Sequence, residues 1–228
     1  MRRINQQSTI NNQRFSKSLS VSETFVSLQG EGVWTGWPCF FIRLAGCNLR
    51  CTYCDTQYAY NSGEKRDIES LLDEWRQAGV GLVQVTGGEP LLQSGTYVLL
   101  EALLNEGARV LLETNGSLGL KNVPREVIKI VDRKTPGSAM EEFFLEENLG
   151  WLKQGDQLKF VITARDDYEW AREEVVRLRL SCYTEVLFSP AWGGLAPFQL
   201  AEWIIADRLS VRFQIQLHKI LWGEKRGI

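Results

Sequence analysis

The sequence predicts an α/β fold, an open partial barrel of the (β/α)6 type with a mostly parallel sheet. Short apolar runs alternate with longer amphipathic segments along most of the 228 residues, and this alternation indicates right-handed βαβ units. The strand-like runs number about six or seven, too few for a closed eight-stranded barrel. The chain length suits one domain with a substantial core.

The predicted strands and helices follow one another in regular order. Residues 38–44 form a run rich in aromatic and aliphatic residues, which is typical of a buried strand. The helix expected over residues 67–79 starts at a suitable capping residue, Asp67, carries apolar residues at helical spacing and stops at Gly79. The same two patterns then alternate, with strands expected over residues 81–87, 108–114, 126–132, 156–162, 184–189 and 210–218, and helices over residues 97–107, 138–150, 166–180 and 198–207.

The first 20 residues differ from the rest of the chain. They are rich in Asn, Gln, Ser and Arg and offer little to bury. We therefore expect a flexible polar arm at residues 1–20 and a single core domain at residues 21–228. A strand could begin near Val21.

Composition narrows the class of function. A formal net charge of −2 gives no electrostatic case for binding nucleic acid or an acidic membrane surface. No apolar run approaches the length that spans a bilayer, and nothing resembles an export signal. We expect a cytoplasmic protein, where reducing conditions suit free thiolates.

The unusual residues of the chain all follow predicted strands. Three cysteines follow the first strand, and the motifs TGGEP (residues 86–90), ETNG (113–116), DRKTPGS (132–138) and SPAWG (189–193) follow later ones. His218 ends the last predicted strand. Ligands of α/β proteins bind at the carboxyl ends of strands, so this placement predicts one composite site.

Cys47, Cys51 and Cys54 form a C-x3-C-x2-C run. Three thiolates at this spacing can hold three irons of a [4Fe–4S] cluster and leave the fourth iron open to a ligand. A zinc site is the alternative, but it needs a fourth ligand from Cys39, Cys182 or His218. Disulfides and inert buried thiols are further alternatives.

The cysteine spacing, with an aromatic residue directly before the last cysteine, resembles the signature of the radical S-adenosylmethionine (SAM) enzymes. In that family the open iron binds the amino and carboxylate groups of SAM and delivers the electron that cleaves it. TGGEP resembles the family's GGE motif, which contacts the SAM amino group. The resemblance implies a [4Fe–4S] cluster on Cys47, Cys51 and Cys54 and a SAM site at Tyr53, Cys54, Asp55, Gly88, Glu89, Glu113, Asp132, Lys134 and Ser189.

Residues 27–59 (SLQGEGVWTGWPCFFIRLAGCNLRCTYCDTQYA) resemble the 7-carboxy-7-deazaguanine synthases among these enzymes. The resemblance implies a radical SAM carbon–nitrogen lyase that converts 6-carboxy-5,6,7,8-tetrahydropterin to 7-carboxy-7-deazaguanine with release of ammonia. It also implies Mg2+ at Thr56, an electron donor of the flavodoxin or ferredoxin type, and a homodimer. The implied substrate residues are Leu28, Gln29, Gly30, Glu31, Arg43, Thr86 and His218, with Glu31, Glu113 and His218 in catalytic roles.

The chemistry of these side chains agrees with the implied roles. Arg43 offers a planar fork of donors for a carboxylate, Glu31 can accept hydrogen bonds from the edge of a pterin, and Thr56 gives Mg2+ a neutral oxygen. Each also has an ordinary structural interpretation as a turn, a solvated carboxylate or a local ion pair. Two other functions stay open: another small radical SAM enzyme such as a glycyl-radical activase, and a non-catalytic zinc or iron–sulfur module.

Overall fold

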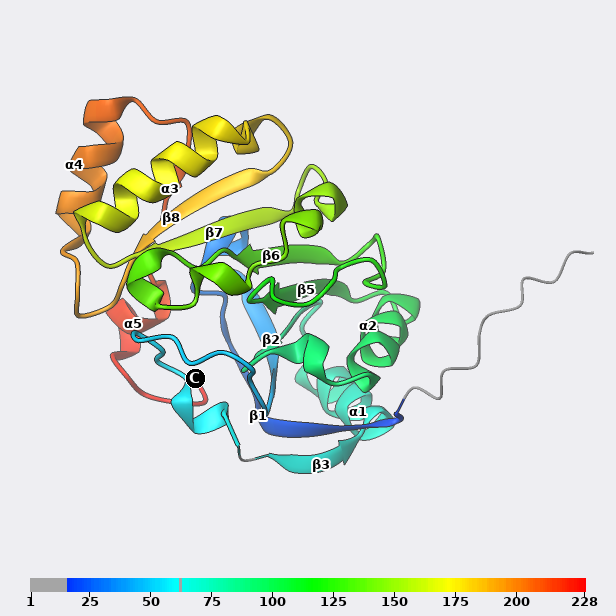
Figure 1. Ribbon diagram of the computed structural model, residues 1–228. Helices are drawn as coiled ribbons and strands as arrows, with labels where there is room; N and C mark the ends of the chain where they lie inside the picture. Colours follow the sequence, from blue (N-terminus) through cyan, green and yellow to red (C-terminus); the bar gives the residue numbers. More distant parts are fainter. Residues whose placement is uncertain (1–15, 62) are drawn as a thin grey trace, which may run out of the picture.

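A computed structural model describes residues 16–61 and 63–228 of the chain. In this part of the chain, strands form one sheet in the order β3-β1-β2-β4-β5-β6-β7-β8-β9 (Figure 1). The strand bounds are β1 Ser18–Leu28, β2 Pro38–Leu44, β3 Glu64–Asp67, β4 Leu82–Gly87, β5 Arg109–Thr114, β6 Ile128–Asp132, β7 Gln157–Ile162, β8 Glu185–Pro190 and β9 Arg212–Phe213.

The sheet is mostly parallel and open, as the sequence predicts. Every neighbouring pair from β2 through β9 is parallel, whereas β1 pairs antiparallel with both β2 and β3. The strand order ends at β3 and β9 without closing into a barrel. The predicted partial-barrel class is therefore confirmed, with an antiparallel extension at one edge.

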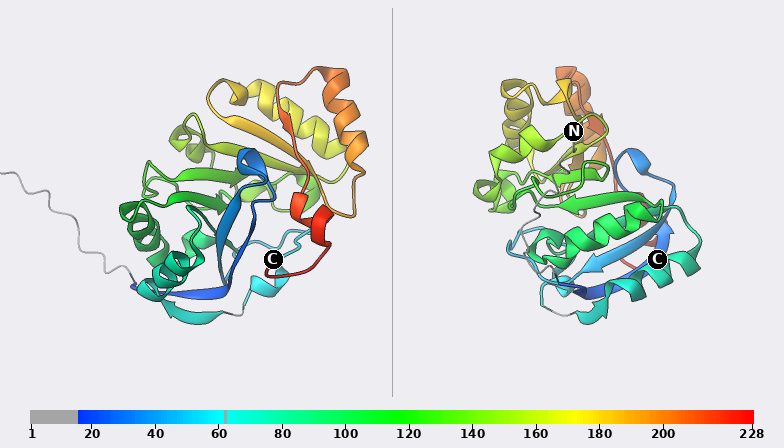
Figure 2. Two further views of the ribbon diagram at one scale, coloured as in Figure 1. Left: turned by 180° about the vertical axis from the view of Figure 1, so that it is seen from behind. Right: turned by 90° about the vertical axis from the view of Figure 1, so that its right-hand side faces the viewer.

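Helices α1 to α4 cover the outside of the curved sheet, whereas α5 lies on its inner side (Figures 1 and 2). The main core packs alternate strand residues such as Phe40 and Val83 against helix residues such as Leu71 and Tyr168. The helix bounds are α1 Ile68–Ala78, α2 Gly95–Asn105, α3 Arg165–Arg177, α4 Pro197–Asp207 and α5 Leu217–Trp222. No helix in the described ranges is long and apolar enough to cross a membrane.

The inner face of the sheet changes from apolar to polar along each strand. A small cluster that includes Phe41, Leu82, Leu111 and Ile130 occupies the earlier positions. Because side chains two residues apart lie on the same face of a strand, the next inner positions are polar. They are Arg43 on β2, Gln84 and Thr86 on β4, Glu113 on β5, Asp132 on β6 and Lys159 on β7. The candidate site is thus built on the carboxyl-terminal halves of the central strands.

Two predicted elements are wrong. Residues 138–150 do not form an α-helix but lie in short 3-10 turns, because the side chain of buried Asn148 bonds to the backbone of the loop after β5 and Ala139 has a left-handed φ of 58°. Residues 210–218 do not form one strand. Only the two residues of β9 pair with β8, and His218 lies in the first turn of α5 rather than at a strand end.

Two strands at the sheet edge were not predicted in full. The strand anticipated near Val21 begins at Ser18, so residues 18–20 of the expected arm belong to the sheet, with Leu19 buried. Residues 1–15 of the arm lie outside the described residues. The four residues of β3, Glu-Lys-Arg-Asp, carry no apolar signal and pair only with β1.

Candidate active site

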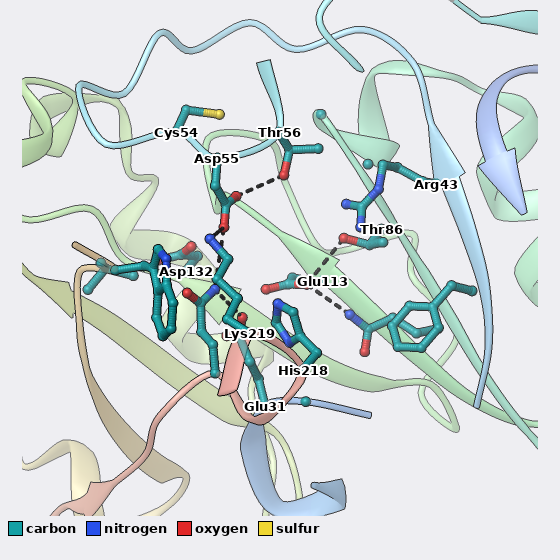
Figure 3. Close-up of a pocket in the computed structure, with 18 of the residues that line it drawn as sticks. Glu31, Arg43, Cys54, Asp55, Thr56, Thr86, Glu113, Asp132, His218 and Lys219 are labelled. Carbon is teal, nitrogen blue, oxygen red and sulfur yellow. Dashed lines mark hydrogen bonds and ion pairs between the residues drawn. The ribbon is translucent and has the colours of Figure 1, made fainter. Parts of the chain in front are cut away.

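A cavity of about 660 Å³ opens at the carboxyl ends of the strands. Side chains from the sheet, the cysteine-bearing loop and α5 point into it (Figure 3). Of the site residues that the sequence predicts, all but Glu89 line this cavity. The predicted composite site therefore exists as one space.

The cysteine-bearing loop follows β2 and leads into the 3-10 turn Gln57–Ala59. Cys47, Cys51 and Cys54 all line the cavity, whereas Cys39 and Cys182 do not. Thr52 fixes the loop, because its backbone N–H and its hydroxyl donate to Ser138 O (3.2 Å) and Gly137 O (2.7 Å). The cavity thus offers three cysteine thiols and no fourth.

A mononuclear metal site finds no support in the geometry. Among the described residues, no three Cys, His, Asp or Glu side chains are grouped to hold one ion. Burial raises the pKa of Cys47 and of Cys51. A metal group bound here must therefore displace protons from these thiols, and a zinc ion would still lack its fourth protein ligand.

The Gly-Gly turn after β4 lies against this loop. A Cβ at Gly88 would overlap Gly46 O and come within 2.8 Å of the Cys47 Cβ, so only glycine permits this approach. Glu89 is fully buried, and its carboxylate accepts hydrogen bonds from Thr114 Oγ1 (2.8 Å), Asn115 N (2.7 Å) and Leu91 N (3.0 Å). The Glu89 side chain therefore joins two loops and does not reach the cavity.

Lys159 lies at the centre of the polar inner face, and sequence reasoning missed it. Its Nζ is 2.9 Å from Glu31 Oε2, 2.6 Å from Glu113 Oε1 and 3.7 Å from Asp132 Oδ2. Burial alone would lower the pKa of Lys159, but these carboxylates raise it well above the ordinary value. The signal that could have found it is a lysine inside a buried strand, which is costly unless the lysine is paired.

Glu31 is held by three donors, one from β7 and two from the segment between β9 and α5. Besides Lys159, Gln216 Nε2 donates to Oε1 (2.9 Å) and Gln214 Nε2 donates to Oε2 (3.3 Å). Burial would raise the pKa of Glu31, but Lys159 and the Gln216 hydrogen bond lower it to about 2. A carboxylate offers about four acceptor positions, so roughly one remains on Oε1 for a ligand.

Further polar atoms near the thiols lack protein partners. Asp132 Oδ2 binds Lys134 Nζ at 2.7 Å, but Asp132 Oδ1 and the Tyr53 hydroxyl are buried without a hydrogen bond to any described residue. Ser189, at the end of β8, is also buried and lines the cavity. Buried polar atoms are normally satisfied, so these atoms are suited to a ligand with hydroxyl groups.

The opposite wall of the cavity carries Arg43. Its Nε donates to Glu23 Oε1 at 2.8 Å, and the Tyr58 hydroxyl donates to the same oxygen at 2.7 Å. Glu23 was not predicted as a site residue, yet it fixes the guanidinium while the described residues leave its two terminal nitrogens without a hydrogen-bond acceptor. Arg43 can therefore present its donor fork to an anion in the cavity.

Glu113, Thr86 and Gln29 form a second hydrogen-bonded chain on the inner face. Glu113 Oε2 accepts from Gln84 Nε2 (2.8 Å) and Thr86 Oγ1 (3.2 Å), and Gln29 donates to Gln84. Gln84 was not predicted from the sequence. These hydrogen bonds connect Gln29 of the predicted QGEG segment with the strand-end carboxylate of Glu113. Leu28, the residue before that segment, also lines the cavity.

Asp55 and Thr56 lie between the cysteines and α5 (Figure 3). Asp55 Oδ2 pairs with Lys219 Nζ at 2.6 Å, and Thr56 Oγ1 donates to Asp55 Oδ1 at 2.9 Å. Burial would raise the pKa of Asp55, but Lys219 holds it below its ordinary value. This pair connects the cysteine-bearing loop to the carboxyl-terminal helix.

Gly30 sets the position of His218. A Cβ on Gly30 would overlap the His218 imidazole, and Gly30 O accepts the backbone N–H of Leu217 at 3.0 Å. Burial lowers the pKa of His218. The close packing of Gly30 against His218 places the neutral imidazole beside the QGEG segment.

Gly30→Ala is expected to displace the start of α5 and to weaken ligand binding in the cavity. The overlap should cost about 1–3 kcal/mol. It should displace Gln216 and Lys219, the residues at the start of α5 that hold Glu31 and Asp55. We expect a roughly tenfold higher substrate KM, measured together with kcat and the thermal midpoint. Gly81→Ala is the matched control, since a Cβ there meets no atom within 4 Å. An unchanged KM in Gly30→Ala would show that α5 adjusts freely.

Comparison with known proteins agrees with this geometry. The sequence profile of the radical SAM superfamily matches residues 41–134. The 7-carboxy-7-deazaguanine synthase of Koribacter versatilis is 42% identical over 226 residues, which span 92% of this chain and 100% of that protein. The synthase of Chlorobaculum tepidum is also 42% identical, over 92% of this chain and 97% of that protein. The chain belongs to the 7-carboxy-7-deazaguanine synthase family.

A solved structure supports the fold of this synthase-family chain. The crystal structure of QueE from Escherichia coli superposes with a TM-score of 0.72 at 24% identity, covering 88% of this chain and 95% of that one. This likeness establishes the arrangement of the sheet.

Membership of the radical SAM superfamily implies a [4Fe–4S] cluster and SAM. The residues fit both groups. Three thiols without a fourth match a cluster with one open iron, and the Gly88 turn leaves room beside Cys47 that a side chain would fill. Asp132 Oδ1 and the Tyr53 hydroxyl, which have no hydrogen-bond partner among the described residues, are polar atoms that fit a ligand such as SAM.

Proposed function

We propose that this chain is a 7-carboxy-7-deazaguanine synthase, a carbon–nitrogen lyase that contracts the ring of 6-carboxy-5,6,7,8-tetrahydropterin with release of ammonia. One observation carries the proposal. A single cavity contains the three-thiol loop and, on its other walls, the carboxylate Glu31 and the cation Arg43. That combination suits a substrate with an amino-pyrimidinone edge and a carboxylate.

The two ends of the pterin are assigned to different walls. Arg43, oriented through its Nε by Glu23, binds the substrate carboxylate with its terminal nitrogens. The free acceptor position of Glu31 Oε1 takes an N–H of the pyrimidinone edge. Gln29, Thr86 and the neutral imidazole of His218 line the space between these groups.

The cofactor side of the cavity has separate residues. Cys47, Cys51 and Cys54 would hold the cluster, while Tyr53, Asp132, Lys134 and Ser189 would hold SAM. When bound, these groups supply the radical that abstracts a substrate hydrogen. The chain itself positions the two molecules and excludes water, with Glu113 lying between the SAM side and Thr86.

We assign Mg2+ to Thr56. Its hydroxyl lies beside Asp55, whose pKa is held low by Lys219, and faces the cavity (Figure 3). A neutral hydroxyl oxygen is an acceptable ligand for Mg2+, which keeps water or substrate oxygens in its other positions.

The partners are proposed by resemblance to the family. An electron donor of the flavodoxin or ferredoxin type supplies the reducing electron, and the working form is a homodimer. All five cysteines lie in the described part of the chain and none forms a disulfide. This supports a reducing compartment such as the cytoplasm.

The proposed reaction is tested directly. The protein is reconstituted anaerobically with iron and sulfide and incubated with SAM, a strong reductant, Mg2+ and the tetrahydropterin. Formation of 7-carboxy-7-deazaguanine, detected by chromatography with mass spectrometry, is the expected result. SAM cleavage without this product would point to another radical SAM reaction, such as glycyl-radical activation.

Arg43→Lys is expected to raise the KM for the tetrahydropterin roughly tenfold or more, because lysine keeps the charge but cannot form a bidentate pair. Cluster content and SAM affinity should stay within about twofold, since Arg43 lies on the wall away from the thiols. Arg212→Lys serves as the control, because Arg212 is half-exposed and pairs with Glu185 outside the cavity. Turnover by Arg43→Lys at unchanged KM would refute the carboxylate assignment.

A further inference from the structure

Lys159 connects three carboxylates that come from three parts of the fold. It projects from the inner face of β7, where its exposed fraction is 5%. Asp132 is its direct cross-strand partner on β6, Glu113 lies one strand further on β5, and Glu31 follows β1 at the far edge of the cavity. One ammonium therefore bridges segments more than a hundred residues apart in the sequence.

Lys159 is the cation shared by three neighbouring carboxylates. Glu31, Glu113 and Asp132 face one another across the cavity floor, while Lys134 pairs only with Asp132. His218 faces Glu31 from α5, but burial lowers its pKa and favours the neutral imidazole. Without Lys159, Glu31 would keep no ion pair among the described residues, and Glu113 would keep only the longer-range attraction of Arg43. Like charges that are partly buried would then take up protons or move apart.

A second buried lysine shows what a purely structural pair looks like in this fold. Lys129 on β6 pairs with Asp156 at 2.9 Å, and both side chains are buried outside the cavity. Asp156 is occupied further by the backbone N–H groups of Lys129 and Lys153. Lys159 differs because it lines the cavity and because its partners Glu31 and Asp132 keep acceptor positions open to ligands.

We infer that Lys159 is a positioning residue that holds Glu31, Glu113 and Asp132 as one fixed set of carboxylates and thereby links the pterin side of the cavity to the SAM side. The inference rests on the proposed function. It adds that recognition of the pterin N–H groups depends on an acceptor-only Glu31, which Lys159 maintains. The expected loss on removing Lys159 falls mainly on the pterin, since Lys134 still pairs with Asp132 on the SAM side.

The test compares Lys159→Met and Lys159→Arg with Lys129→Met as the matched buried-lysine control. Affinities for SAM and for the tetrahydropterin are measured by calorimetry on the reconstituted protein, and each variant is checked by its thermal midpoint and iron content. Lys159→Met should weaken pterin binding roughly tenfold or more and SAM binding less than about threefold. Lys129→Met should lower the thermal midpoint, because it leaves Asp156 without its ion pair, and should keep both affinities.

The pH dependence of pterin affinity separates positioning from simple structural support. In the wild type, Glu31 stays ionised because its pKa is about 2. Protonation of Glu31 should therefore not weaken pterin affinity between about pH 6 and 8. In Lys159→Met, burial dominates and raises the pKa of Glu31, so affinity should weaken as the pH falls through that range relative to the wild type. Lys159→Arg restores a cation, so its pterin affinity should no longer weaken in this way as the pH falls.

The outcomes distinguish the inference from the proposed function. A wild-type protein that neither binds nor converts the tetrahydropterin overturns the function. Wild-type turnover together with unchanged pterin affinity and an unchanged pH profile in a folded Lys159→Met overturns the positioning role alone. Equal losses of affinity in the Lys159→Met and Lys129→Met variants would also overturn it, because a general structural effect would then explain both.

Discussion

Replacing Cys47, Cys51 or Cys54 by alanine should abolish SAM cleavage, with 5′-deoxyadenosine falling below detection. Each thiol lines the cavity, and the described chain offers no further cysteine there to take its place. A [4Fe–4S] cluster held by two thiolates would lose a second iron position to solvent and would not keep its structure. Iron and sulfide content and the ultraviolet–visible spectrum after anaerobic reconstitution report the loss independently of activity.

Cys39→Ala and Cys182→Ala are the controls for this prediction. Cys39 is fully buried in β2 within the small apolar cluster, and its thiol lies 3.7 Å from Phe40 O. Alanine should therefore cost a small amount of stability and leave the iron–sulfur cluster intact. Cys182 is exposed and distant from the cavity lining. Loss of the cluster from a folded Cys182→Ala protein would contradict the three-thiol assignment.

The parallel part of the fold could be predicted because its signals are local. Residues 38–44 and 157–162 are apolar runs bounded by polar turns, and each becomes a strand of the sheet. The convergence of the motifs could also be predicted, since carboxyl ends of parallel strands share one edge. These inferences need no knowledge of which side chains touch.

The errors occur where distant contacts override the local pattern. The segment around Asn148 has helical composition, but its buried amide bonds to Leu120 N, Gly116 O and Leu118 O instead of leaving the backbone to form a regular helix. The residues after β9 have the sequence pattern of a strand, but the side chains of Gln214 and Gln216 form hydrogen bonds with Gly32 N and Glu31. Functional contacts thus replace a regular strand at the point where the site is completed.

Individual side-chain roles were harder to predict than the site as a whole. Glu89 belongs to a motif that resembles a SAM contact, but its carboxylate is consumed by Thr114 and the backbone. Lys159 and Glu23 belong to no recognisable motif, although both organise residues that do. A sequence motif can predict which residues belong to a site. Which charged side chains pair with each other depends on the register between strands, as for Asp132 and Lys159.

Glu31→Gln should separate SAM cleavage from product formation. In the wild type, Glu31 Oε2 accepts from Lys159 and Gln214, and Oε1 accepts from Gln216. Whichever way the glutamine amide is turned, its NH2 group faces at least one of these donors, and when it takes the Oε1 position it also removes the acceptor left for the pterin. The unpaired donors should reduce formation of the deazaguanine roughly ten- to hundredfold.

Cleavage of SAM should survive in the same variant, because Glu31 contacts none of the three cysteines and lies on the pterin wall of the cavity. The measurement is the ratio of 5′-deoxyadenosine to 7-carboxy-7-deazaguanine by chromatography at saturating SAM with a strong reductant. Glu185→Gln is the control, since Glu185 pairs with Arg212 at the surface and should leave the ratio unchanged. A parallel loss of both products in Glu31→Gln would place Glu31 in the cofactor site or in the fold. An unchanged ratio would exclude Glu31 from pterin recognition, because an acceptor that binds the substrate cannot become a donor without cost.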